Sequence, residues 1–201
     1  MNREDKNVFK VYDEVSEWFN ENRSKHLIEL KYLQELLSYL PEKSEILDLG
    51  CGTGKPIMEY FLSQNYRVIG VDASWKMLEI AKSNFPNNEF YLMDMRSLKI
   101  ERKFDAIIAW HSFFHLPVDD QEKLIPKLSN LLNPNGLFLF TSGPENGISW
   151  GKINGQDLFH ASLSESQYKN LLQNNNFKVI KHVVQDPMCG GATVWLAQLV
   201  N

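Results

Sequence analysis

Hydrophobic residues recur along the first forty positions with the spacing of amphipathic helices. Leu30, Leu33, Leu37 and Leu40 lie three or four residues apart, and a proline directly follows the last of them. A weaker amphipathic segment over residues 8–20 comes before them. We therefore predict two helices at the start of the chain, which either cap a core or cover a pocket.

The pattern changes at residue 44, where short apolar runs begin to alternate with helical segments. Strands are predicted at residues 46–49, 67–71, 90–93, 106–110, 137–141, 177–184 and 193–200. Helices are predicted over residues 55–62 and in the segments that follow Ser74, Asp119 and Ser164. This alternation indicates a doubly wound α/β fold, in which helices cover both faces of a mostly parallel sheet. The last two strands have no helix between them, so we expect them to be antiparallel.

Polar residues mark where several of these helices begin. Ser74 is a typical N-cap, and Asp119 with Glu122 and Ser164 with Gln167 have the spacing of capping boxes. The helix after Asp119 contains a proline, which we expect to kink or shorten it.

Two segments rich in asparagine and glycine are predicted to lie outside strands and helices. Residues 133–136 have the composition of a turn, and residues 143–155 that of a long loop that could shape a pocket. The sequence has no linker, repeat or low-complexity tract. We therefore predict one domain over residues 1–201, with a helical cap at 1–40 and an α/β core at 44–201.

Composition and charge narrow the classes of function. With 21 Lys and Arg against 25 Asp and Glu, the net charge is −4, which disfavours a general nucleic-acid binder. Cys51 and Cys189 are too few for a disulfide framework, and their flanks lack metal-ligand spacing, so we expect a reduced, cytoplasmic setting. We find neither a signal-peptide core nor an apolar run long enough to span a membrane.

The most informative stretch is a glycine-rich turn after the first predicted strand. Gly50, Gly52 and Gly54 lie where that strand leads into a helix, and a ligand can approach the main chain there because no Cβ intervenes. In doubly wound sheets, ligands bind outside the carboxyl ends of the strands at the topological switch point. Asp72 ends the second predicted strand, where a carboxylate can accept hydrogen bonds from a ribose diol. These features predict a nucleoside-binding pocket.

The glycine spacing distinguishes between nucleoside cofactors. A dinucleotide fingerprint requires a glycine at the position that Lys55 occupies. A phosphate-binding P-loop is also excluded, because the glycine spacing is one residue short and Pro56 replaces the hydroxyl residue that would bind magnesium. The loop therefore favours a nucleoside cofactor without a pyrophosphate and disfavours NAD.

At this point the chain resembles the class I S-adenosylmethionine-dependent methyltransferases over most of its length. Residues 48–54 are similar to that family's first motif, Asp72 to its ribose-binding acid, and Asp94 to the acid that meets the adenine amino group. Residues 104–109 resemble the fourth-strand motif, and residues 132–136 the turn before the fifth strand. The resemblance implies a seven-stranded sheet with its last strand antiparallel. It also implies S-adenosylmethionine as cofactor, S-adenosylhomocysteine as product and no metal.

The resemblance assigns cofactor contacts to the N-terminal cap and to the ends of the first four strands. The implied contact residues are Tyr12, Asp48, Gly50, Cys51, Gly52, Gly54, Asp72, Ala73, Met77, Asp94, Met95 and Ala109. Tyr12 is included because an N-terminal helix closes over the cofactor in many members of the family.

Catalysis by such an enzyme depends mainly on positioning, because the methyl group of a sulfonium ion is already activated. Holding the acceptor in line can lower the barrier by ~7–11 kcal/mol, and a general base is needed only where the acceptor must lose a proton. His111 and His115 follow the fourth strand and are the candidate bases. Trp150 and His160 are candidates for facing the substrate.

Methyl transfer to a small-molecule acceptor is the favoured function. The acidic net charge supports it, and so does the fourth strand, which lacks the Asn-Pro-Pro-Tyr type of sequence shared by enzymes that methylate amino groups of adenine or glutamine. We expect no nucleic-acid or membrane partner, and the sequence leaves the oligomeric state open. The alternatives are a methyltransferase for a protein or RNA group, a non-catalytic S-adenosylmethionine-binding regulator and, more distantly, an NAD-dependent oxidoreductase.

Overall fold

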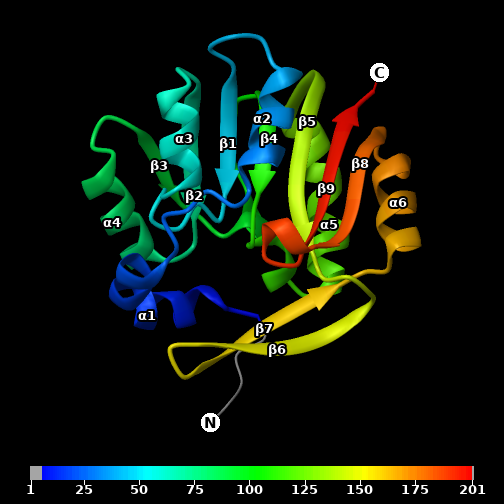
Figure 1. Cartoon of the computed structure of the whole chain (residues 1–201). Helices are drawn as coiled ribbons and strands as arrows, with labels where there is room; N and C mark the ends of the chain where they lie inside the picture. Colours follow the sequence, from blue (N-terminus) through cyan, green and yellow to red (C-terminus); the bar gives the residue numbers. More distant parts are fainter. Residues whose placement is uncertain (1–5, 201) are drawn as a thin grey trace.

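A seven-stranded sheet forms the centre of the molecule in the computed structural model, which describes residues 6–200 (Figure 1). Its strands are β1 (Glu45–Leu49), β2 (Arg67–Asp72), β3 (Glu89–Leu92), β4 (Phe104–Ala109), β5 (Leu132–Ser142), β8 (Phe177–Asp186) and β9 (Ala192–Leu199). They lie in the order β3-β2-β1-β4-β5-β9-β8. Strands β1 to β5 pair in parallel, whereas β9 is antiparallel to both β5 and β8. The predicted doubly wound sheet and its antiparallel final pair are confirmed.

Helices cover both faces of this sheet. They are α1 (Phe9–Asn22), α2 (Leu30–Ser38), α3 (Ile57–Ser63), α4 (Trp75–Asn84), α5 (Val118–Leu131) and α6 (Glu165–Asn174), with short 3₁₀ turns η1 (Met95–Ser97), η2 (Phe113–His115) and η3 (Pro187–Cys189). Side chains of α5 and α6 belong to one hydrophobic cluster, and those of α2 and α3 belong to another on the opposite face. The molecule is therefore a three-layer α/β/α arrangement.

The alternation of side chains along β1 connects the sequence pattern to the two clusters. Leu47 and Leu49 belong to the cluster with α5 and α6, whereas Ile46 belongs to the one with α2 and α3. A strand places successive side chains on opposite faces, so Asp48 projects to the same side as Ile46. Burying a carboxylate without a partner costs free energy, so the buried position of Asp48 suggests that it has a functional role.

The structure confirms two predicted helix starts and corrects a third. The Ser74 hydroxyl accepts a hydrogen bond from the Met77 N–H, and Ser164 forms the complete capping box with Gln167. Helix α5 instead begins two residues earlier than predicted, after Pro117, and no side chain caps it. Proline fixes the backbone angle needed at a helix start, so this helix forms without the predicted Asp119 cap. Its internal proline does not shorten it, since the helix continues to Leu131.

The predicted loop over residues 143–155 is wrong. Most of it forms β6 (Gly147–Ile153), which pairs with β7 (Gln156–Ser162) as an antiparallel hairpin. Asn154 and Gly155 have positive φ angles at its two-residue turn, the geometry that favours hairpins. The turn at residues 133–136 lies inside β5, where the pairing with β4 shifts its register.

This topology creates an opening between two neighbouring parallel strands. From β1 the chain returns to pair β2 on one side, and from β4 it returns to pair β5 on the other. Loops that leave the carboxyl ends of β1 and β4 therefore diverge, which is the topological switch point of such sheets. In Figure 1, α1 and the β6–β7 hairpin lie across this edge of the sheet.

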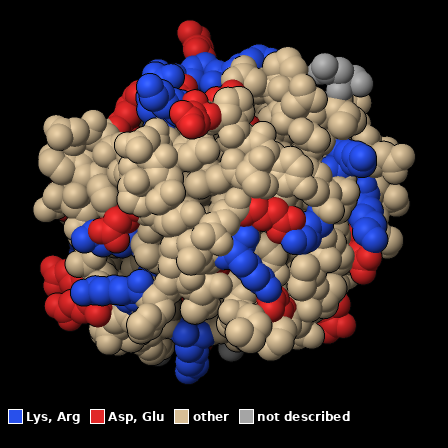
Figure 2. All heavy atoms as spheres, turned by 45° about the horizontal axis from the view of Figure 1, so that its top comes forward, with Lys and Arg blue, Asp and Glu red and all other residues tan. Residues whose placement is uncertain are grey.

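The opposite edge of the sheet has a mixed surface. On the face shown in Figure 2, blue basic side chains are interspersed with red acidic ones, and no continuous patch of one sign covers it. Within residues 6–200, no helix has both the length and the apolar character needed to cross a bilayer.

Candidate cofactor pocket and active site

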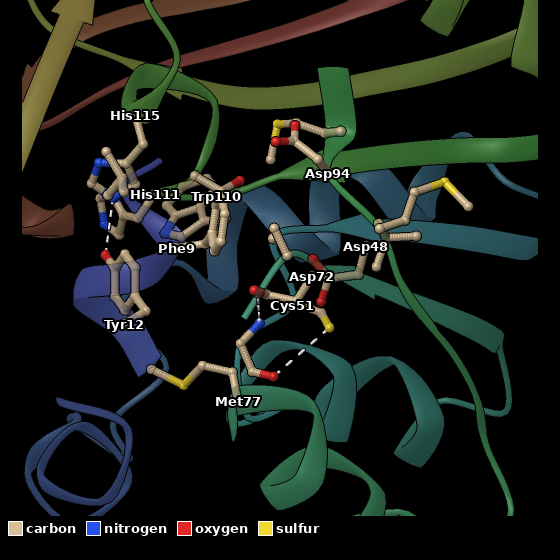
Figure 3. A pocket seen from close by; sticks show the side chains of 18 of the residues that line it. Phe9, Tyr12, Asp48, Cys51, Asp72, Met77, Asp94, Trp110, His111 and His115 are labelled. Atoms are coloured by element: carbon tan, nitrogen blue, oxygen red, sulfur yellow. Dashed lines mark hydrogen bonds between the residues drawn. The ribbon is translucent and has the colours of Figure 1, made fainter. Parts of the chain in front are cut away.

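A cavity lies at the switch point, between the loop after β1 and the loop after β4 (Figure 3). Eleven of the twelve residues that the sequence assigned to cofactor contacts line it, and Ala109 does not. The cavity is also lined by Phe9, Phe19 and Arg23 from the α1 region and by Trp110, His111, Ser112 and His115 after β4. Residues that are far apart in sequence therefore meet around one space.

Two of the loop glycines are required for different reasons. A Cβ on Gly50 would lie 2.3 Å from the Ser112 Cβ, so this glycine allows the loops after β1 and β4 to pack together. Gly52 has a φ of +55°, and within 4 Å a Cβ there would meet only a Phe19 ring atom, at 3.9 Å. Gly52 thus presents bare main chain to the cavity, where a ligand can approach it.

Asp72 fixes the shape of this loop. Its carboxylate accepts hydrogen bonds from the Gly52 N–H and from the Ser74 N–H, each at 2.8 Å. Figure 3 shows the first of these bonds beside Cys51. Because an ionised carboxylate has about four lone-pair sites, Asp72 can still accept hydrogen bonds from a ligand.

Two carboxyl groups at the end of the cavity near β1 and β2 hold unusually high pKa values. Burial, with a further contribution from the negative charge of Asp72, raises the pKa of Asp48 to about 7. Burial also raises the pKa of Asp72 to about 6, although its main-chain hydrogen bonds oppose the shift. Neighbouring buried carboxyls of this kind favour a ligand that brings positive charge.

Asp94 lies after β3 in a different environment. Its carboxylate accepts hydrogen bonds from the Arg96 main-chain N–H at 2.8 Å and from the Arg96 guanidinium at 2.5 Å. Burial tends to raise the pKa of Asp94, but the bonds from Arg96 outweigh it and lower the pKa. Asp94 is therefore an ionised hydrogen-bond acceptor at the part of the cavity wall that follows β3.

His115 is held by hydrogen bonds at both ring nitrogens. Nδ1 lies 2.9 Å from the Phe159 carbonyl oxygen, and Nε2 lies 2.9 Å from the Tyr12 hydroxyl. A carbonyl oxygen can only accept, so Nδ1 carries the proton and the Tyr12 hydroxyl donates to Nε2. Burial lowers the pKa of His115 to about 3, which keeps the ring neutral. His115 thus links α1 to β7 and has no free nitrogen for proton transfer.

The ring nitrogens of His111, unlike those of His115, are not engaged in hydrogen bonds within residues 6–200. Its φ is +52°, a conformation that non-glycine residues rarely adopt, and its main-chain N–H donates to the Thr141 hydroxyl at 2.9 Å. Neither ring nitrogen makes a hydrogen bond to another part of the chain that the structure describes. Burial, with a contribution from the positive charge of Arg23, lowers the pKa of His111 to about 4. The ring is therefore neutral and able to accept a proton.

Arg23 and Trp110 are among the cavity residues that sequence reasoning missed. Arg23 follows α1 directly, and its guanidinium lies 3.6 Å from Glu29 and 5.6 Å from the centre of the Phe19 ring. Trp110 is 5% exposed, and within residues 6–200 its indole N–H has no hydrogen-bond partner. An unpaired buried donor in a cavity wall is costly unless a ligand or water satisfies it. The switch-point rule could have identified Trp110, since it directly follows β4.

Three predicted site residues, Ala109, Trp150 and His160, do not line this cavity. Ala109 is fully buried, belongs to the cluster beneath α5 and α6, and does not line this cavity, so its contact with the cofactor stays a prediction. Trp150 lines neither this cavity nor its neighbour, because its ring packs edge-on against Phe159, 5.3 Å away between centroids. His160 lines a second cavity together with His111.

Known proteins resemble the chain in sequence. Residues 46–136 match the family model described as a methyltransferase domain. An uncharacterized methyltransferase of Alkaliphilus oremlandii is 26% identical over 137 residues, which is 67% of this chain and 60% of that protein. A trans-aconitate 2-methyltransferase of Escherichia coli is 38% identical over 119 residues, 57% of this chain and 45% of that enzyme. The chain thus spans about half the length of these curated relatives.

Solved structures share the whole fold. A 1,6-didemethyltoxoflavin-N1-methyltransferase from Burkholderia thailandensis, solved with 1,6-didemethyltoxoflavin and S-adenosylhomocysteine bound, has a TM-score of 0.75 at 19% identity. The similarity covers 96% of this chain and 88% of that one. An amino pentose methyltransferase from Micromonospora echinaspora, solved with S-adenosylmethionine, has a TM-score of 0.73 at 17% identity, covering 94% and 97%.

Proposed function

We propose that this chain, which belongs to the class I S-adenosylmethionine-dependent methyltransferases, transfers a methyl group from that cofactor to a small-molecule acceptor. The observation that carries the proposal is the cavity at the switch point, where the bare main chain of Gly52 lies beside the carboxylates of Asp48 and Asp72. S-Adenosylmethionine is cationic at sulfur and at its amino group, and buried carboxyls with raised pKa values favour such a ligand.

The residues around the cavity fit the parts of this cofactor. In the proposed pose, Asp72 accepts hydrogen bonds from the ribose hydroxyls and Asp94 accepts one from the adenine amino group. Asp48 lies nearest the positive charges. Gly52 leaves space for the ligand, and the Phe19 ring 3.9 Å from its Cβ position closes the cavity on the α1 side. The other predicted contacts, including Tyr12, Met77 and Met95, complete the walls.

Arg23 and Trp110 give the amino-acid end of the cofactor a partner for its carboxylate. Arg23 supplies a guanidinium, the group best suited to bind a carboxylate with two hydrogen bonds. Trp110 supplies a buried N–H that has no partner within residues 6–200. In the proposed pose, the carboxylate accepts hydrogen bonds from both groups.

The methyl acceptor reacts at the end of the cavity near β4. When bound, S-adenosylmethionine supplies a methyl group activated by positive sulfur; the acceptor's lone pair bonds to its carbon while the carbon–sulfur electron pair stays on sulfur. We assign His111 to take the acceptor's proton, because its neutral ring has free nitrogens. His115 is a positioning residue, since both of its nitrogens are engaged.

A small-molecule acceptor is supported by the chemistry of the structural relatives and by the shape of the site. The two solved enzymes described above are named for an amino pentose and for didemethyltoxoflavin. A second cavity next to the first gives an acceptor a place to bind, which a purely cofactor-sensing regulator would not need. The cytoplasmic location expected from the cysteine content stays a prediction; both cysteines are unpaired in the structure.

Calorimetry with S-adenosylmethionine and with NAD tests the proposal first. We expect binding of S-adenosylmethionine and none of NAD; the reverse result would reject the assignment.

Asp72→Ala should weaken S-adenosylmethionine binding by ~1.5–3 kcal/mol, the range for hydrogen bonds to a charged group, and an unchanged dissociation constant would reject the ribose role. Release of S-adenosylhomocysteine from fractionated small metabolites would then identify the acceptor. Binding without release from any fraction would favour the regulator.

A further inference from the structure

A second cavity adjoins the cofactor cavity, and His111 lines both. It encloses about 440 Å³, within the usual size range of small-molecule sites. Four segments form its wall: residues 142–149, residues 160–162 of β7, residues 190–192 and the positions of His111 and Phe114. The β6–β7 hairpin thus forms one side of this space, across the carboxyl edge of the sheet (Figure 1).

The wall of this second cavity has no positive side chain. Among the described residues that line it there is no lysine and no arginine, and Glu145 is its one carboxylate. The pKa values of His111 and His160 are both lowered, chiefly by burial, so their rings are uncharged near neutral pH. A carboxylate or phosphate placed here would lose water without gaining a cationic partner.

The remaining wall is polar but mostly self-satisfied. The Ser142 hydroxyl donates to the Gly143 carbonyl and accepts from the Trp195 indole, and the Ser162 hydroxyl accepts from the Gly143 N–H. His160 differs, because its ring nitrogens make no hydrogen bond with any residue from 6 to 200. Its ring meets the Phe114 ring edge-on, 4.9 Å away between centroids. An aromatic edge and two free imidazoles are therefore the groups left for a ligand.

We propose that this second cavity binds the methyl acceptor, and that it selects a small polar ring compound without negative charge, with an amine or hydroxyl directed at His111. The inference rests on the proposed methyl transfer and adds the acceptor's place and charge. His160 and Phe114 hold the acceptor ring, and Glu145 at the exposed rim favours a cationic substituent over an anionic one.

Matched acceptors that differ only in charge test this selection. The probes are tyramine against 4-hydroxyphenylacetate and dopamine against 3,4-dihydroxyphenylacetate, each with S-adenosylmethionine, and the readout is release of S-adenosylhomocysteine. Ligand-observed NMR with the S-adenosylhomocysteine-loaded protein measures binding separately from turnover. We expect the cationic member of each pair to bind up to about fivefold more tightly, since one favourable exposed charge pair contributes up to ~1 kcal/mol.

Charge reversal at the rim sharpens the test. Glu145→Lys should reduce or invert the preference for the cation within each pair. Glu122→Lys is the control, because it makes the same change of net charge at an exposed position of α5, and it should leave the preference unchanged. Equal binding within the pairs, preference for the anion, or no binding of any probe would overturn the acceptor proposal. Calorimetric binding of S-adenosylmethionine in the same samples, together with release of S-adenosylhomocysteine from a fraction of small metabolites, would show that the proposed methyl transfer survives such a result.

Discussion

The two cavities that meet at His111 are built in different ways. The cofactor cavity takes its carboxylates from the ends of β1 and β2 and from the segment after β3, and its glycines from the loop after β1. The second cavity takes its wall from the β6–β7 hairpin and from the turn before β9. One side presents main chain and buried acids, and the other presents neutral rings and hydroxyls. The contrast indicates that residues at the ends of single strands determine which cofactor binds, whereas the packing of segments far apart in the sequence determines which acceptor binds.

Gly52→Val should cause the largest loss of cofactor affinity among these variants, and it should affect the cofactor side alone. Valine is strained at a φ of +55°, and its side chain would enter the space that the cofactor needs. We expect S-adenosylmethionine binding to fall by more than about 100-fold, beyond the ~1.5–3 kcal/mol of a lost charged hydrogen bond. Isothermal titration calorimetry measures the change.

Gly155→Ala is the matched control for this variant. Gly155 also has a positive φ, +80°, but it lies at the exposed hairpin turn with no atom within 4 Å of the added Cβ. Its substitution should lower thermal stability through backbone strain and leave cofactor affinity unchanged. Intact cofactor binding in Gly52→Val would place the cofactor elsewhere and remove the basis of the contrast between the cavities.

His111→Asn tests the point where the two cavities meet. Asparagine tolerates the left-handed backbone better than most residues, so the main chain should be preserved while the imidazole is lost. With the acceptor identified, we expect kcat to fall about 10²–10⁴-fold, the usual contribution of a general base, at unchanged cofactor affinity.

The pH dependence of kcat distinguishes a base from a packing residue. The wild type should lose activity as His111 becomes protonated at low pH, and this limb should disappear in His111→Asn. His26→Asn, at an exposed position, is the control that should change neither quantity. An unaltered kcat in His111→Asn would mean that the acceptor needs no base, and His111 would then only join the two cavities.

The same contrast explains how far the sequence could predict the structure. Strand periodicity, the glycine spacing, the acid that ends β2 and the acid after β3 are local signals, and they were enough to predict the cofactor cavity. The hairpin could not be predicted in this way, because residues 143–155 contain six glycines or asparagines and little apolar alternation, so β6 is stabilised mainly by its pairing with β7. The hydrogen bonds that engage both nitrogens of His115 come from residues 103 and 44 positions away, which no local pattern reveals.

Arg23→Met tests a cofactor contact that the sequence did not identify. Removing the guanidinium should weaken S-adenosylmethionine and S-adenosylhomocysteine binding about tenfold, the lower end for a charged hydrogen bond at a partly exposed side chain. Binding of 5′-methylthioadenosine, which lacks the amino-acid portion, should not change. Calorimetry measures both ligands.

Arg67→Met serves as the control for Arg23→Met, because it removes an exposed arginine at the start of β2, away from the cavity. It should leave the affinities for both ligands unaltered. An equal loss for methylthioadenosine and for S-adenosylmethionine in Arg23→Met would show that Arg23 supports the fold of the α1 region and does not hold the cofactor's carboxylate.

The smallest expected effect is a pH dependence confined to the cofactor side. Asp48 and Asp72 have folded-state pKa values of about 7 and about 6, above the 3.8 of an unperturbed aspartate. The ligand-free fold therefore binds more protons than the unfolded chain, and its free energy of unfolding should decrease as pH rises from about 4 to about 7.

A cationic cofactor favours the ionised carboxylates, so the affinity for S-adenosylmethionine should increase as pH rises toward about 7, by at most about tenfold per pH unit for each proton released. Calorimetry in buffers of different ionisation enthalpy counts those protons, and Asp48→Asn should remove the component near pH 7. A pH-independent affinity would show that these carboxyls do not face the cofactor's positive charges, and the electrostatic difference between the two cavities would then have to arise from the acceptor side alone.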